Sequence, residues 1–285
     1  MTEAFPSLVS TAWLADHIDA ADVVVLDASH HLPAAGRDAR ADYTERHIPG
    51  ARFFDLASLV DTTSSVPAAL PRPEQLAERL ANLGVPRGAR IVLYDDSAIR
   101  TSARAWFMLT GSGWQHVAIL DGGLGKWHSE GRALESGTPE IAATADATLH
   151  TPRAVRTKAD MLANLDTHAE QVLDARSADR VYGSGIDPVH GGQNGRIPGA
   201  LNLPYTEVLN PDGTYKAVPE LRAAFEGAGV DLARPLVGTC GSGVTANVLL
   251  FALHLFGKAD TALYDGSWSE WSADPATPKA QGPDA

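Results

Sequence analysis

The only cysteine of the chain, Cys240, stands in the stretch RPLVGTCGSGVTANVLLFALHLFG. The residues before it, PLVGT, form a short apolar run typical of a buried strand. The residues after the loop, VTANVLLFALHLFG, are apolar on every side, which is typical of a buried helix. Cys240 is therefore predicted on a strand-to-helix turn, the edge at which open α/β sheets bind their ligands. A thiolate at such a turn is a candidate nucleophile.

The loop that follows the thiol has the composition of an anion-binding cradle. Gly241 and Gly243 permit a tight curl in which successive backbone N–H groups point inward, and the following helix adds its positive N-terminal end. The hydroxyls of Ser242 and Thr245 are further donors, while Thr245 is equally well placed to cap the helix. The commonest role of a free cysteine is that of a small buried apolar side chain. That role needs no glycine-rich loop, so we interpret Cys240 as functional.

The elements that must position this loop occur twice in the sequence. The first half contains VVVLDAS, HIPGA, IVLYDD and DGGLGKW, and the second half contains QVLDAR, RIPGA, PLVGTC and DGSWSEW in the same order and at nearly the same spacing. A tandem duplication explains this. In the first copy, Val23–Leu26, Ile91–Tyr94 and Val117–Leu120 read as strands, and Pro73–Leu83 and Thr101–Leu109 read as helices.

This alternation of strands and helices predicts the fold class. It is typical of α/β domains in which a parallel sheet carries helices on both faces. We predict an N-terminal domain over residues 1–135, a linker over 136–156 that is rich in Gly, Pro, Thr and Ala, and a C-terminal domain over 157–285. The thiol belongs to the second copy only, because Asp95 in VLYDD takes the matching position of the first.

Composition excludes several function classes. The formal net charge of −12, without a cluster of Lys and Arg, argues against nucleic-acid binding. One cysteine cannot form an internal disulfide or a thiolate zinc cluster, and the histidines show no metal-binding spacing, so we expect no metal. The sequence has no apolar run of about 18 residues and no signal-like leader. We therefore expect a cytoplasmic protein without a membrane partner.

These motifs together resemble the two-domain rhodanese-type sulfurtransferases. The similarity covers nearly the whole chain and includes HIPGARFFD, LPRPEQLAERLANLGV, DGGLGKW, LDARSADRVYG and RIPGALNLPYTEVL. The loop CGSGVTA resembles the version in 3-mercaptopyruvate sulfurtransferases, whereas thiosulfate-preferring rhodaneses usually carry a basic CRKGVTA. The resemblance implies two tandem rhodanese-like domains, with a first copy that has lost its cysteine and serves as a structural half.

The resemblance also implies a mechanism. The Cys240 thiolate attacks the sulfur of 3-mercaptopyruvate, pyruvate leaves, and the persulfide passes its outer sulfur to thioredoxin, to a small thiol or to cyanide. No cofactor is needed, because the loop and the helix terminus stabilise the anions. Arg180 matches the family arginine that binds the donor's carboxylate or sulfonate. The substrate-binding loop comprises Gly241, Ser242, Gly243, Val244 and Thr245.

The chain departs from the family pattern at three positions. Val189 stands where mercaptopyruvate-type members carry a second arginine, and His190 or Arg196 is the candidate substitute. Ala57 and Ala68 stand where a Ser-His-Asp arrangement proposed for this class requires an acid and a histidine. We therefore expect that general-base assistance to the donor is absent or comes from another residue.

Three other functions are alternatives to this one. Thiosulfate is the alternative donor, with the same persulfide mechanism, although the neutral loop lacks the cations that favour it. A Cys-dependent phosphatase needs an arginine at the position of Ala246, so that class is excluded. A non-catalytic binding module is the remaining alternative, and the intact loop at Cys240 argues against it.

Overall fold

The computed structural model describes residues 5–144, 154–190 and 192–282. Residues 145–153 of the predicted linker lie outside the described residues. The chain divides into two units, and each includes one short segment from the other half of the sequence. The first unit comprises Met1–Asp61, Leu70–Arg153 and Pro211–Tyr215, and the second comprises Thr62–Ala69, Ala154–Asn210 and Lys216–Ala285.

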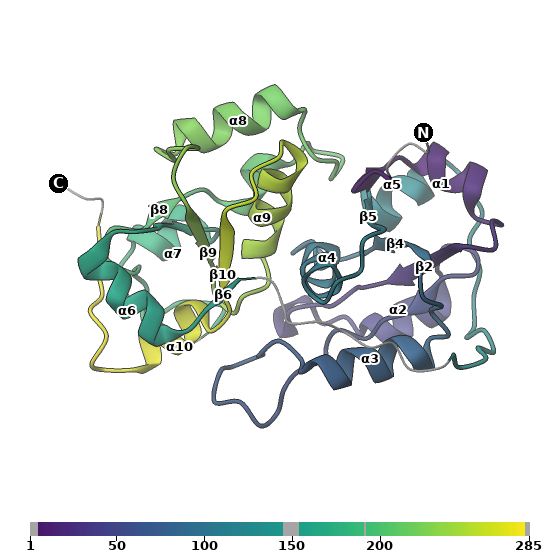
Figure 1. Cartoon of the computed structure of the whole chain (residues 1–285), viewed down its shortest axis with the longest axis horizontal. Coiled ribbons are helices and arrows are strands. Elements are labelled where there is room, and N and C mark those ends of the chain that lie inside the picture. Colours follow the sequence, from purple (N-terminus) through teal and green to yellow (C-terminus); the bar gives the residue numbers. More distant parts are fainter. Residues whose placement is uncertain (1–4, 145–153, 191, 283–285) are drawn as a thin grey trace. The chain divides into compact units, whose positions relative to one another are not determined.

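The first unit is built on a parallel sheet with the strand order β1-β5-β4-β2-β3, five strands within the described residues (Figure 1). Its elements in chain order are β1 (Leu8–Val9), α1 (Thr11–His17), β2 (Val23–Asp27), η1 (Pro33–Ala35), α2 (Ala39–Glu45), β3 (Arg52–Phe53), α3 (Pro73–Asn82), β4 (Arg90–Tyr94), α4 (Ser102–Gly111), β5 (Val117–Leu120) and α5 (Gly123–Ser129).

The second unit repeats this architecture with the strand order β6-β10-β9-β7-β8, again parallel and five-stranded in the part that is described. Its elements in chain order are β6 (Val155–Arg156), α6 (Lys158–Thr167), β7 (Gln171–Asp174), α7 (Ala178–Tyr182), β8 (Leu201–Asn202), η2 (Tyr205–Val208), α8 (Val218–Gly227), β9 (Leu236–Thr239), α9 (Ala246–Leu255), β10 (Thr261–Tyr264) and α10 (Ser267–Ala273).

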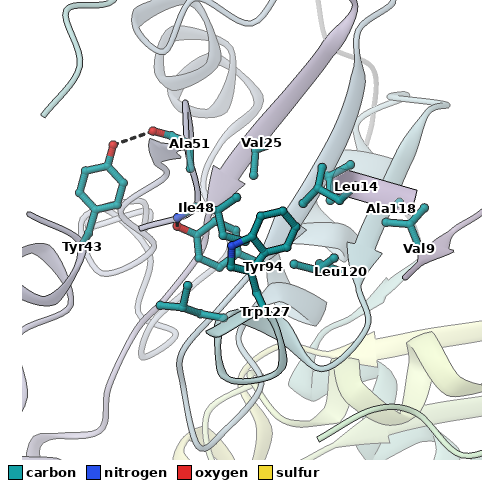
Figure 2. Packing of buried hydrophobic residues seen from close by; sticks show 12 residues of the cluster. Val9, Leu14, Val25, Tyr43, Ile48, Ala51, Tyr94, Ala118, Leu120 and Trp127 are labelled. Atoms are coloured by element: carbon teal, nitrogen blue, oxygen red, sulfur yellow. Dashed lines mark hydrogen bonds between the residues drawn. The ribbon is translucent and has the colours of Figure 1, made fainter. Parts of the chain in front are cut away.

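The central strands are apolar on both faces because helices cover both sides of each sheet. Figure 2 shows one such layer in the first unit, where Leu14 of α1 and Trp127 of α5 pack on Val25 and Tyr94 of the sheet. The hydroxyl of Tyr43 on α2 donates to the carbonyl of Ala51 at 2.7 Å, which satisfies a buried polar group at the edge of the layer.

In the second unit, α6 and α10 cover one face of the sheet, and α9 lies on the opposite face (Figure 1). Gly238 of β9 lets α9 approach closely, because a Cβ there would lie 3.1 Å from Leu250. Residues 246–253 of α9 are all buried, as its uniformly apolar sequence predicted. The predicted α/β class and the parallel sheets with helices on both faces are confirmed.

Candidate active site

The structure places Cys240 on the turn between β9 and α9, with a side chain that is 1% exposed. The start of α10 fixes its backbone. The N–H of Cys240 donates to Oγ of Ser267 at 3.1 Å, and the N–H of Trp268 donates to the carbonyl of Cys240 at 3.0 Å. Ser267 in turn donates its hydroxyl to the carbonyl of Tyr264, the last residue of β10, at 2.8 Å. The thiol is therefore held at the carboxyl ends of two neighbouring strands.

The loop after the thiol presents unused backbone donors. Within residues 5–144, 154–190 and 192–282, the N–H groups of Gly241, Ser242, Val244 and Thr245 donate to no acceptor. Thr245 is the N-cap of α9, but its side chain makes no capping bond, so its hydroxyl is not used in the helix. Ser242 and Thr245 are both half-buried. These donors, together with the N-terminus of α9, are suited to bind an anion.

The carbonyl groups of the loop are engaged elsewhere. The Nδ2 group of Asn247 donates to the carbonyls of Gly243 at 2.7 Å and Val244 at 3.2 Å. The carbonyl of Gly241 accepts from the N–H of Ser269 at 2.9 Å and from its hydroxyl at 2.6 Å. Gly243 has a φ of 71°, a left-handed conformation that favours glycine. The loop is thus preorganised, with the carbonyls of Gly241, Gly243 and Val244 engaged and four of its N–H groups without an acceptor among the described residues.

Arg180 on α7 is held by a buried carboxylate, Asp187. Its Nε lies 3.1 Å from both carboxylate oxygens and its Nη2 lies 2.8 Å from Oδ2. Burial raises the pKa of Asp187, but the hydrogen bonds from Arg180 and from the N–H of Val189 lower it more, so the pKa stays below its ordinary value. Nη1 of Arg180 has no hydrogen-bond partner among the described residues. This nitrogen of the 15% exposed side chain remains for a ligand.

A second arginine shares the same carboxylate. Nη1 of Arg176 lies 3.5 Å from Asp187, while Nη2 donates to Asp174 and to the carbonyl of Gly195, both at 2.7 Å. The fully buried guanidinium of Arg176 covers the ring of Trp268 at 4.7 Å. Arg176 is therefore engaged chiefly by Asp174 and contributes a second positive charge beside Asp187.

His190 lies against the loop. Its imidazole occupies the space beside Gly241 so closely that a Cβ at position 241 would collide with Nε2. The N–H of His190 points at Oδ1 of Asp187 at 3.3 Å, so the same carboxylate orders both His190 and Arg180. His190 as a whole is exposed, but desolvation of its ring beside the loop, and then the positive charge of Arg180, lower the pKa of His190.

The two candidate substitutes for the missing second arginine differ in position. Arg196 is buried, its guanidinium covers the ring of Tyr182 at 5.0 Å, and it donates to the carbonyl of Gly282. Arg196 is therefore a structural residue of the C-terminal segment, and the suggestion that it takes the place of a second anion-binding arginine is wrong. His190, next to the loop and to Arg180, is the candidate that remains. Val189 itself is 40% exposed.

The matching loop of the first unit is filled by its own side chain. The carboxylate of Asp95, which is 2% exposed, accepts the N–H of Ser97 at 3.0 Å and the N–H of Ser102 at 2.9 Å. The N-caps that follow, Thr101 and Thr245, have nearly the same backbone angles, φ −72° with ψ −17° and −18°. The first unit therefore keeps a similar loop, but the side chain of Asp95 takes up its N–H groups.

Sequence reasoning missed Arg176, Asp187 and the serines of α10 as parts of the site. A comparison of the two copies could have pointed to Arg176, because the first copy has Ser29 at the matching position. No local pattern marks Asp187 as part of the site, since the arginines that it contacts lie before the loop, on α7 and after β7. Ser267 and Ser269 lie in DGSWSEW, a repeated motif whose pattern does not single out its serines.

None of the described helices is long and apolar enough to cross a membrane. The model of the rhodanese-like domain matches residues 10–130 and 157–274. The 3-mercaptopyruvate sulfurtransferase of Mus musculus is 40% identical over 94% of this chain and 93% of its own length. The thiosulfate sulfurtransferase of Cricetulus griseus is 39% identical over 98% and 96%. The crystal structure of SseA from Escherichia coli, a 3-mercaptopyruvate sulfotransferase with the rhodanese fold, aligns with a TM-score of 0.84 and 38% identity over 92% of this chain and 99% of that chain.

Proposed function

Since this chain belongs to the rhodanese family, we propose that it is a sulfurtransferase in which Cys240 accepts a sulfur atom from a small anionic donor and passes it to an acceptor. One observation carries the proposal. Among the described residues, four N–H groups of the loop after the single thiol donate to no acceptor, and Nη1 of Arg180 has no hydrogen-bond partner. This combination fits a reaction in which both the nucleophile and the product are sulfur anions.

The proposed cycle has two steps. The Cys240 thiolate forms an S–S bond with the donor's sulfur, the bond between that sulfur and the donor breaks, and the desulfurated donor leaves. The N–H groups of Gly241, Ser242, Val244 and Thr245 stabilise the thiolate before this step and the persulfide after it, without any reorganisation of the loop. An acceptor thiol or cyanide then attacks the outer sulfur and restores the thiolate. Arg180 binds the donor's carboxylate through Nη1.

We favour 3-mercaptopyruvate as the donor. The loop carries no cation, and His190 fills the space beside Gly241 that a longer side chain would need. The donor's negative charge is then met chiefly by Arg180 and by backbone N–H groups, a set suited to one planar carboxylate. The relatives named for this activity are similar along nearly the full length of the chain.

Thiosulfate is the second candidate. The relative named thiosulfate sulfurtransferase is almost as similar, at 39% identity, so overall identity does not separate the donors. The observation in favour of thiosulfate is Val189, which supplies no second guanidinium for a carboxylate. The donor preference therefore depends on what His190 contributes.

The remaining assignments follow from this function. The catalytic half is the predicted C-terminal domain, residues 157–285, and the N-terminal domain, residues 1–135, is the structural copy in which Asp95 replaces the thiol. A reactive thiol fits a reducing compartment, so we propose the cytoplasm. Thioredoxin, a small thiol or cyanide would serve as acceptor.

The test is steady-state kinetics of sulfur transfer with 3-mercaptopyruvate and thiosulfate side by side, at a fixed concentration of one thiol acceptor. The proposal predicts a higher kcat/KM for 3-mercaptopyruvate and loss of both activities in Cys240→Ser. A higher kcat/KM for thiosulfate would instead assign the second donor. Absence of turnover with both donors would favour the binding module.

A further inference from the structure

Donor cleavage differs between the two candidate donors in its need for a proton. When the C–S bond of a thiol donor next to a ketone breaks, its electron pair passes to carbon as an enolate, and that carbon must take up a proton to become the methyl ketone. Thiosulfate releases sulfite, which leaves with the electron pair and needs no proton. A site that uses a mercaptopyruvate-type donor therefore gains from a side chain that exchanges protons near neutral pH.

The loop itself offers no such group. Its side chains after Cys240 are those of glycine, serine, valine and threonine. Arg180 stays charged throughout the working range, and Asp187, which accepts its hydrogen bonds, stays ionised. The positions at which the family arrangement would place an acid and a histidine are Ala57 and Ala68.

His190 is placed where that group is required. Its ring lies against Gly241, the residue directly after Cys240, and its backbone N–H is oriented by the carboxylate that also holds Arg180. The imidazole therefore lies beside the loop, and its backbone is held by the carboxylate that also holds Arg180.

The charged groups that face His190 come from three elements. Arg180 on α7 and Arg176 after β7 disfavour the imidazolium, and Asp187 on the same loop favours it. Partial burial against the loop acts in the same direction as the arginines. The net result is an imidazole that is neutral at neutral pH and so free to accept a proton.

We infer that His190 is the proton carrier of donor cleavage for a mercaptopyruvate-type donor, an inference that rests on the proposed function. The Cys240 thiolate forms the S–S bond, the donor's C–S bond breaks, and its electron pair moves onto the enolate carbon. The donor's thiol proton passes from the new persulfide to Nε2 of neutral His190. The imidazolium then delivers this proton to the enolate carbon, which yields pyruvate and the persulfide anion. The donor carbon is reduced by the electron pair that the cysteine sulfur loses, so no other reactant is consumed.

The experiment measures single-turnover persulfide formation in full-length wild-type protein, in His190→Gln and in His128→Gln. His128 is an exposed histidine on α5 of the first unit and serves as the matched control. In His190→Gln, the rate with 3-mercaptopyruvate is expected to fall on the order of 100-fold, the usual contribution of a positioned acid-base group. The rate with thiosulfate, and the rate of sulfur release from a preformed persulfide to a thiol, are expected to stay unchanged. The pH profile of the variant with 3-mercaptopyruvate should take the shape of the thiosulfate profile.

Two results would overturn the inference while leaving the proposed function intact. An equal loss of rate with both donors would show that His190 only supports the structure of the loop. An unchanged rate with 3-mercaptopyruvate would show that His190 takes no part in donor cleavage. A wild-type protein that cleaves only thiosulfate would overturn the proposed donor itself.

A second variant tests the contact independently. Gly241 does not have a positive φ, so its backbone accepts alanine, and the new Cβ displaces the His190 ring. Gly241→Ala should therefore slow cleavage of 3-mercaptopyruvate in the wild-type background. It should cause little further loss in a His190→Ala background, since the colliding ring is absent there. Additive losses would contradict the proposed contact.

Discussion

Nε and Nη2 of Arg180 donate to the carboxylate of Asp187, and Nη1 has no hydrogen-bond partner in the described part of the chain. Asp187 is fully buried, so the pair depends on both partners. An arginine fixed in this way binds a carboxylate with little loss of side-chain entropy, because its rotamer is already set.

Replacement of Asp187 by Asn should weaken donor binding and destabilise the second unit. The change leaves Arg176 and Arg180 without their shared negative charge in a buried setting, which costs about 3–5 kcal/mol of unfolding free energy. KM for the donor should rise more than kcat falls. Urea unfolding and steady-state kinetics measure the two effects, and the control is Asp179→Asn, which changes an exposed carboxylate on α7, the helix of Arg180. An unchanged KM would show that Asp187 does not position Arg180.

Replacement of Arg180 by Lys keeps the charge but removes the planar fork. The ammonium cannot hold Asp187 and a donor carboxylate in the same geometry, so kcat/KM should fall about 10- to 100-fold. The second half-reaction, from persulfide to acceptor thiol, should be unaffected. Equal activity of the lysine variant would mean that Arg180 acts only as a distant positive charge.

The two copies differ in how they treat the carboxylate at the end of their second strand. Asp174 of β7 is paired with Arg176, whereas Asp27 of β2 has Ser29 in that place. Burial raises the pKa of Asp27 to about 6 from its ordinary 3.8, against the hydrogen bonds from Ser29. Because the folded state holds the proton more tightly, stability present at about pH 4 should be lost as pH rises through 6, on the order of 3 kcal/mol.

Asp27→Asn should remove that part of the pH dependence and raise stability above pH 6, as measured by urea unfolding between pH 4.5 and pH 8. Asp121, whose pKa burial also raises to about 6, contributes with the same sign and remains in the variant. The matched change Asp174→Asn should instead lower stability, since it breaks the pair with Arg176. A steeper pH dependence in Asp27→Asn would contradict this assignment.

The filled cradle of the first unit should matter for folding and not for turnover. Asp95→Ala removes the acceptor of two buried N–H groups, so the unfolding free energy should fall by about 1–3 kcal/mol. kcat/KM should stay unchanged at a temperature at which the variant is folded, as monitored by circular dichroism. Loss of activity in the folded variant would assign the first unit a direct part in the reaction.

The sequence was most informative where a strand is apolar on both faces. Val117–Leu120 matches β5 at both ends, and the predicted strand Ile91–Tyr94 begins one residue after β4. The two-residue edge strands β1 and β6 have no pattern of their own, and they exist because β5 and β10 provide a partner. Periodicity cannot reveal such strands.

The site was predictable as far as its chemistry lies in adjacent residues. The loop from Cys240 to Thr245 is a local motif, and its backbone follows from its glycines. The network of Asp187 with Arg176 and Arg180 is formed by tertiary packing, so it cannot be predicted from the spacing of these residues in the sequence. The contact between His190 and Gly241 could not be predicted from the sequence either, because the two residues are far apart in the chain and the ring takes the space that a Cβ at position 241 would need.

In the proposed cycle, Cys240 carries the transferred sulfur. The most direct measurement is the intact mass of the protein, followed by peptide mapping, after incubation with 3-mercaptopyruvate in the absence of an acceptor. The account predicts a gain of one sulfur atom, located on Cys240, which disappears when a thiol acceptor is added and does not form in Cys240→Ser. An unchanged mass in protein that still turns over the donor, or a sulfur atom located elsewhere, would contradict the account.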